Sequence, residues 1–96
     1  MSEEPVYELE FVVRSELGLH ARPAGRFVAL AARFEARISV GRGDEWVDGR
    51  SILSLLSLAA GRGVALRIRA EGADAASAVE ALGALLEQSA EETGTG

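Results

Sequence analysis

The chain has 96 residues, 15 of them acidic and 10 basic, and a formal net charge of −5. This length predicts one domain with a single modest core, and the negative charge argues against nucleic acid as the main partner. The chain has no cysteine and one histidine, which excludes disulfides, zinc–cysteine sites and multi-histidine metal sites. No apolar run is long enough to cross a membrane and the acidic residues 1–5 are unlike a signal peptide, so we expect a cytoplasmic protein without membrane insertion.

Residues 6–14 alternate between apolar and polar side chains, which is typical of a strand with one buried face. The side chains expected to face the core are Tyr7, Leu9, Phe11 and Val13. Residues 15–18 then form a turn, in which Gly18 supplies backbone freedom.

The stretch from Gly18 to Ala24 reads Gly-Leu-His-Ala-Arg-Pro-Ala and contains the single histidine, His20. Pro23 is typical of the first turn of a helix. The apolar stripe that follows predicts a helix ending near Phe34, and it consists of Phe27, Leu30, Ala31 and Phe34. His20 would therefore lie at or just before a helix N-terminus, where unpaired backbone N–H groups and the helix dipole favour an anion.

A neutral imidazole in this position has a ring nitrogen that can act as a nucleophile. A phosphoryl group on His20 would face the helix N–H groups and the Arg22 guanidinium, so the pattern indicates a preorganised site for phosphoryl transfer. The residues alone leave open that His20 is a surface or capping histidine without chemistry. Six arginines against two glutamates give residues 14–42 a charge of +4, which suits an anionic substrate or an acidic protein partner. We expect Arg33 and Arg37 only to solvate the outside of the helix.

Three more strands are predicted, over residues 36–40, 45–48 and 64–70, with a hairpin turn at 41–44 and Trp46 packed on the sheet edge. Asp74 is the expected N-cap of a last helix, whose buried stripe is Ala75, Val79, Leu82 and Leu86. We expect the polar residues 91–96 to be disordered. The element order βαββαβα predicts an α+β domain with its helices on one face of an antiparallel sheet.

A short second helix is predicted over residues 52–60, with Ser51 as its N-cap and the glycines at 61 and 63 as its terminator. Its apolar residues cover more than one face, and they are Ile52, Leu53, Leu55, Leu56 and Leu58. A small domain cannot bury all of them, so we expect an exposed apolar patch that contacts other proteins. An overpacked core is the alternative.

The Gly18–Ala24 stretch resembles the active-site signature of HPr, the histidine-containing phosphocarrier family of the bacterial phosphoenolpyruvate-dependent phosphotransferase system. Residues 50–58 (Arg-Ser-Ile-Leu-Ser-Leu-Leu-Ser-Leu) resemble the family's regulatory-serine segment and second helix. The resemblance extends over residues 6–88. It implies that residues 1–96 form a single HPr domain, an open-faced sandwich in which three helices cover one face of a four-stranded antiparallel sheet.

This resemblance also implies a function, that of a stoichiometric phosphocarrier and not an enzyme. His20 would accept a phosphoryl group on Nδ1 from phospho-enzyme I and pass it to an enzyme IIA of the sugar phosphotransferase system. The phosphoryl group comes from phosphoenolpyruvate, and no cofactor is expected. The implied phosphate-binding residues are Arg22, Ala21, Pro23 and Gly18, and the implied partner contacts are Ile52, Leu53 and Leu56.

Ser51 matches the serine that HPr kinase/phosphorylase modifies in many members of the family. Leu53, Ser54 and Ala59 depart from the common pattern, in which Met, Gly and Gly are frequent at these positions. We expect a monomer. One alternative is an HPr-like regulatory domain of a nitrogen-related phosphotransferase branch without sugar transport. A second is an interaction domain that acts only through the apolar second helix. A hydrolase using Ser51 or Ser15 with His20 is the weakest, since no nucleophile-elbow pattern is present.

Overall fold

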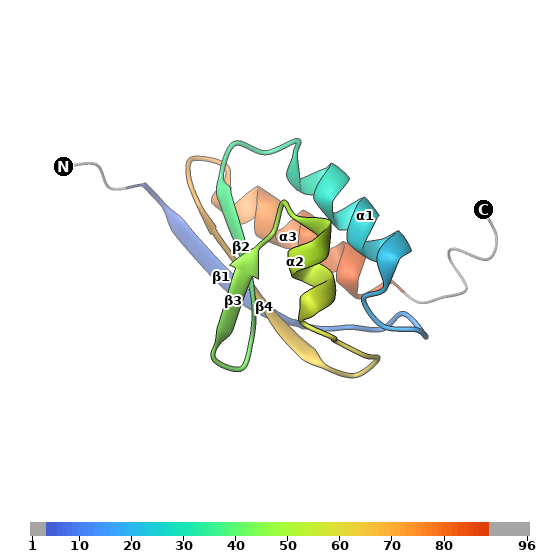
Figure 1. The fold of residues 1–96 in the computed structure, drawn as a ribbon. Coiled ribbons are helices and arrows are strands. Elements are labelled where there is room, and N and C mark those ends of the chain that lie inside the picture. The colour runs from blue at the N-terminus through green and yellow to red at the C-terminus, as the bar shows by residue number, and fades with distance from the viewer. Residues whose placement is uncertain (1–3, 89–96) are drawn as a thin grey trace.

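The computed structural model describes residues 4–88, which form one antiparallel sheet covered on one face by three helices (Figure 1). The strands are β1 (Val6–Val12), β2 (Arg37–Arg42), β3 (Glu45–Asp48) and β4 (Ala65–Glu71), in the spatial order β1-β4-β2-β3. The helices are α1 (Ala21–Ala31), α2 (Ile52–Ser57) and α3 (Ala75–Leu86). The predicted α+β open-faced sandwich is confirmed. The prediction for residues 91–96 lies outside the described residues.

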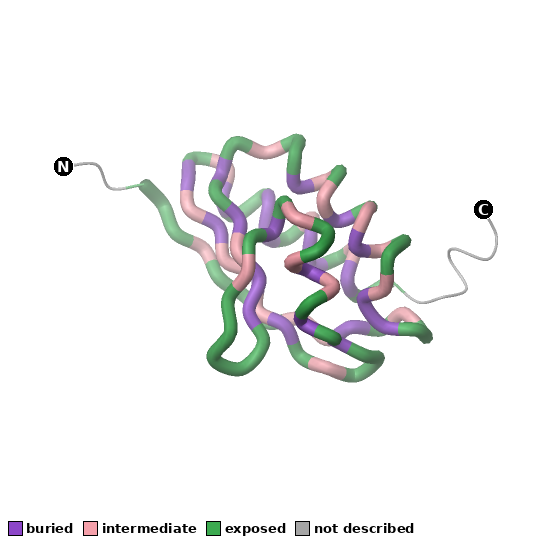
Figure 2. Tube along the Cα trace, viewed as in Figure 1, coloured by how far each residue is buried: buried purple, intermediate pink, exposed green. Residues whose placement is uncertain are grey.

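Alternation along the strands separates a helix-covered face of the sheet from an open face. In the central strand β4, Leu66 and Ile68 are fully buried beneath the helices, whereas Arg67 and Arg69 project from the open face. The same alternation appears as changing colours along the strands in Figure 2. The helices cover the edge strand β1 less completely. Leu9 lies opposite the buried Ile68, yet its side chain is 39% exposed. The expectation that Leu9 would be a core residue is therefore only partly correct.

The core lies between the sheet and the helices, and its largest fully buried side chains are Phe27, Ile38, Leu55, Leu66, Ile68 and Leu82. Helix α3 approaches β1 very closely at Gly83, where an added Cβ would lie 2.1 Å from the Phe11 ring. Burial of these large apolar side chains is the main favourable contribution to folding.

The helix ends differ from those predicted from the sequence. Helix α1 stops at Ala31, and Phe34 lies in the following loop, half-buried against the core. Helix α2 stops at Ser57, and Ala59 then adopts a left-handed conformation with φ of +50°. Ala59 therefore ends the helix where glycines 61 and 63 were expected to do so.

Arg42 and Asp74 stabilise loops through contacts that are remote in sequence. The Arg42 guanidinium donates to the carbonyls of Leu58 and Ala59 at 2.8 and 2.9 Å, satisfying groups that the end of α2 leaves free. Asp74 precedes α3 but its carboxylate makes no capping bond. It accepts instead from the backbone N–H groups of Glu35 and Ala36, each at 2.9 Å. Asp74 is therefore the N-cap residue, as predicted, but these two amides from another loop occupy both carboxylate oxygens, so its side chain does not cap the helix.

Candidate functional site

His20 occupies the N-cap position of α1, with extended backbone angles of φ −88° and ψ −170°. Its carbonyl accepts the first hydrogen bond of the helix, from Ala24 N–H at 2.9 Å. Its half-buried imidazole makes no capping bond, and no hydrogen bond to it is found within residues 4–88. Both ring nitrogens are therefore available for chemistry within the described part of the chain.

The first turn of α1 presents backbone donors beside this ring. The helix begins at Ala21, two residues before Pro23, so the proline is the third helical residue and contributes no N–H. The N–H groups of Ala21 and Arg22 have no partner in the described residues, as the first turn of a helix leaves them free. An anion on the imidazole would meet these two donors and the positive end of the helix dipole.

Gly18 shapes the turn that leads to His20. Its φ is +78°, and an added Cβ would lie 2.5 Å from the carbonyl oxygen of Ala60. The adjacent Leu19 N–H donates to that same oxygen at 2.8 Å. The turn is thus held against the segment after α2, which brings two parts of the chain together at the site. The N–H of Gly18 donates to the Ser15 carbonyl at 3.0 Å, so it contributes to the turn itself.

Two hollows flank His20. The larger is an open pocket of about 480 Å³ whose lining includes Arg22, Arg26 and Glu16 together with the end of α3. A second, shallower hollow of about 340 Å³ is lined by His20 together with Leu17 and Leu56. His20 therefore lines both hollows, and apolar atoms make up most of the surface of each.

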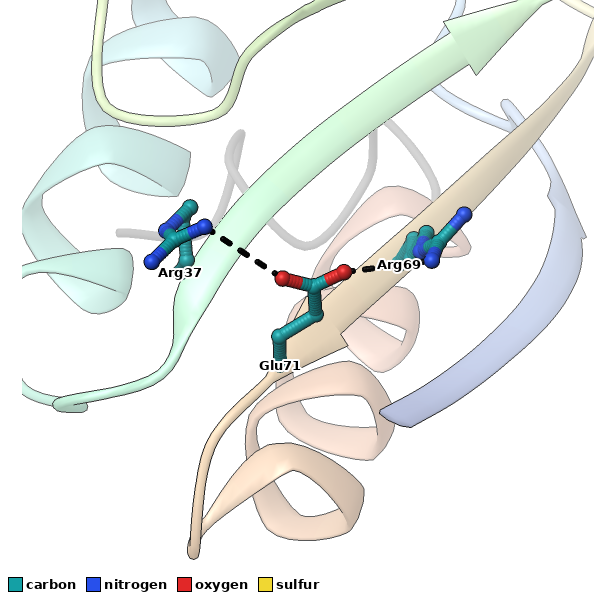
Figure 3. Close-up of polar contacts among 3 residues, drawn as sticks. All are labelled: Arg37, Arg69 and Glu71. Atoms are coloured by element: carbon teal, nitrogen blue, oxygen red, sulfur yellow. Dashed lines mark hydrogen bonds and ion pairs between the residues drawn. The ribbon is translucent and has the colours of Figure 1, made fainter. Parts of the chain in front are cut away.

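The positive charge of residues 14–42 is spread over two faces of the molecule. Arg37 lies on the open face of the sheet, where it pairs with Glu71 at 3.4 Å, and Arg69 pairs with the same carboxylate at 3.1 Å (Figure 3). Only Arg22 and Arg26 line the pocket at His20, and neither makes an ion pair within residues 4–88. The idea of one basic region around His20 is therefore wrong. The expectation that Arg37 solvates the helix is also wrong, because this residue belongs to β2.

Helix α2 divides its apolar residues between the core and the surface. Leu55 and Leu58 are buried, whereas Leu53 is 80% and Ile52 41% exposed and Leu56 is half-buried. The expected exposed patch is confirmed, and the alternative of an overpacked core is wrong.

Leu17, which sequence reasoning passed over, adds a further exposed apolar side chain beside His20. It is 78% exposed and lines both hollows. A leucine inside a turn, where polar residues prevail, was the available signal. We call Leu17, Ile52, Leu53 and Leu56 the apolar rim.

Ser51 is the N-cap of α2, as predicted. Its hydroxyl oxygen accepts from Ser54 N–H at 3.1 Å, and the residue is half-buried. The capping bond alone is a sufficient structural reason for a serine at this position.

Between residues 4 and 88, acidic side chains and His20 form no group of three that could hold a metal ion. In the same part of the chain, every helix is too short or too polar to cross a membrane.

Comparison with known proteins assigns this arrangement to a family. Residues 7–88 match the family model described as the PTS HPr component phosphorylation site. The phosphocarrier protein HPr of Pseudomonas aeruginosa is 44% identical over 75 residues, which span 77% of this chain and 83% of that protein.

Two solved structures support the same assignment. The structure of the phosphocarrier protein HPr from Bacillus anthracis has 40% identity and a TM-score of 0.81, covering 84% of this chain and 96% of that one. Crh, the catabolite repression HPr of Bacillus subtilis, has 34% identity and a TM-score of 0.66, covering 85% and 98%. The chain belongs to the HPr family of phosphocarrier proteins of the phosphotransferase system.

Proposed function

We propose that His20 accepts a phosphoryl group from the phosphohistidine of enzyme I and passes it to a histidine of an enzyme IIA. The observation that carries this proposal is the imidazole at the N-cap of α1, next to two backbone N–H groups and the Arg22 guanidinium, none of which has a partner within residues 4–88. Positioning and charge stabilisation are the main contributions that phosphoryl transfer requires of a protein, and this site supplies both.

The transfer step balances without any further reactant. The Nδ1 lone pair of a neutral His20 attacks phosphorus, the N–P bond to the donor imidazole breaks, and its electron pair returns to the donor nitrogen. Negative charge on the three transferred oxygens is then shared among the N–H groups of Ala21 and Arg22 and the Arg22 guanidinium. Pro23 and Gly18 supply no hydrogen bond to the phosphoryl group and act by shaping the backbone around it. Pro23 has no N–H, and the N–H of Gly18 donates to the Ser15 carbonyl within the turn. Transfer to enzyme IIA is the same step in reverse, with this chain as the donor.

The apolar rim is the proposed docking surface for both partners. It borders His20 directly, since Leu17 and Leu56 line a hollow with the imidazole. A partner seated there would bury exposed apolar area and exclude water from the transferred group.

Ser51 is the proposed site of regulation by an HPr kinase/phosphorylase. It lies one residue before Ile52 of the rim, and a phosphate there adds nearly two negative charges to the docking surface. We expect that charge to weaken docking of an acidic partner.

A regulatory role without sugar transport is the second candidate, and the similarity to Crh, a catabolite repression HPr, favours it. Such a role would act through the apolar rim and would survive replacement of His20.

The test is incubation with phosphoenolpyruvate and enzyme I from the same organism, followed by intact mass measurement at neutral and at acid pH. We expect one phosphate that is stable at neutral pH, is lost in acid and is absent from the His20→Ala variant. A phosphate that persists in acid, or an unchanged adduct on His20→Ala, would contradict the proposal. Adding a kinase/phosphorylase and ATP tests Ser51, where the adduct should resist acid and disappear in Ser51→Ala.

A further inference from the structure

The Ser15 hydroxyl closes the turn that precedes His20. Its Oγ donates to the Gly18 carbonyl at 2.6 Å, and the Gly18 N–H donates back to the Ser15 carbonyl at 3.0 Å. The contact is partly buried, so water competes with it less than at an exposed turn. Ser15 also lines the 480 Å³ pocket together with His20.

The Gly18 carbonyl links this hydroxyl to the histidine. It accepts a second hydrogen bond, from His20 N–H at 2.9 Å, so one oxygen holds both residues. The orientation of the 18–19 peptide therefore determines whether the His20 N–H has its acceptor. On the other side of that peptide, Leu19 N–H is bound to Ala60.

The position of the imidazole depends on this arrangement. The extended backbone of His20 places its carbonyl on Ala24 N–H, and His20 lines one pocket together with Ala21 and Arg22, whose N–H groups have no partner within residues 4–88. Without the Ser15 hydroxyl, the Gly18 carbonyl accepts only from the His20 N–H. The peptide group between residues 18 and 19 then rotates more freely. The phosphorylated ring would then spend less time against the helix donors.

We propose that Ser15 is a positioning residue for phosphoryl transfer at His20, which rests on the proposed function. It acts through the Gly18 carbonyl on the backbone of the histidine.

The experiment compares Ser15→Ala, Ser15→Thr and Ser57→Ala with the wild-type protein. Ser57 is the matched control, because its Oγ also donates at 2.6 Å to a backbone carbonyl three residues away, here the earlier Ser54 carbonyl in α2. The readout is the equilibrium constant for phosphoryl exchange with enzyme I, obtained from the amounts of both phosphoproteins. That constant compares two folded states, so a loss of folding stability alone does not change it. The free energy of unfolding is measured in parallel.

The equilibrium constant should fall about three- to tenfold in Ser15→Ala, which is the range that one net hydrogen bond spans. Ser15→Thr keeps the hydroxyl and should restore the wild-type value, and Ser57→Ala should match the wild type. An unchanged constant in Ser15→Ala, or an equal fall in Ser57→Ala, would overturn the inference while leaving the carrier function intact. Absence of phosphate on the wild-type protein would overturn the carrier function and the inference with it.

Discussion

Replacing Ala59 with glycine should stabilise the protein, because Ala59 adopts a left-handed conformation that suits glycine. Its φ of +50° is the only positive value of a non-glycine residue within residues 4–88. An L-residue in this region costs roughly 1–2 kcal/mol, which glycine avoids. The greater freedom of glycine in the unfolded chain offsets about 0.4–1 kcal/mol of that gain. The Ala59 methyl is exposed, so little hydrophobic burial is lost.

The net gain for Ala59→Gly is therefore about 0–1.6 kcal/mol, with a central value of about 0.8 kcal/mol. A change of about 1 kcal/mol shifts Tm by roughly 4–8 °C in a domain of this size. Denaturant unfolding followed by circular dichroism measures the free energy directly. Ala32→Gly is the matched control, since Ala32 also follows a helix and is exposed, but its φ is −65°. The control should be destabilised by about 0.4–1 kcal/mol. If both glycine variants were destabilised alike, the strain assigned to Ala59 would be refuted.

Three further substitutions test the site. Gly18→Ala should lower the free energy of unfolding by at least about 2 kcal/mol in denaturant titrations, because its φ is +78° and its Cβ would lie 2.5 Å from a carbonyl oxygen; a near-normal stability would contradict the close approach. Arg22→Ala should slow phosphoryl transfer from enzyme I at least about tenfold in rapid-quench measurements, since hydrogen bonds to charged groups contribute about 1.5–3 kcal/mol. Arg33→Ala, in the turn just beyond the other end of the helix, should retain the wild-type rate. An equal loss in both variants would argue against a specific role for Arg22. Leu53→Asp should change stability by no more than about 0.5 kcal/mol but weaken enzyme I binding about tenfold in calorimetry; unchanged affinity would remove Leu53 from the docking surface.

The position of His20 was predictable because its determinants are local. Pro23 and the apolar stripe after it predict a helix start within two residues of the one observed. Alternation likewise predicts the strands, since one face of each must reach the core. The exposure of an apolar side chain such as Leu53 was predictable from the number of apolar residues in this segment. A six-residue helix in a small domain cannot bury apolar side chains on every face.

The features that the sequence did not predict depend on contacts between distant segments. Asp74 has the residue type and place of an N-cap, yet the amides of Glu35 and Ala36 take its carboxylate, and no local pattern contains that information. The left-handed turn at Ala59, just after α2, is held by Arg42, a strand residue whose guanidinium donates to the carbonyls of Leu58 and Ala59. Charge counting along the chain also misplaced Arg37, because neighbouring residues of a strand project from opposite faces of the sheet.

Trp46 lies on the open face of the sheet, away from the helices that carry His20. Its ring packs on Gly41, where an added Cβ would lie 2.9 Å from the indole, and the Arg67 guanidinium lies 4.6 Å from the ring centroid. Arg67 also donates to the Gly43 carbonyl, which holds the guanidinium over the indole. Because this is the single tryptophan of the chain, intrinsic fluorescence observes one location only. The Trp46 emission therefore reports the unfolding of β2, β3 and β4 and does not change on phosphorylation of His20. The tryptophan emission of a bound partner can then be measured against a constant contribution from this chain.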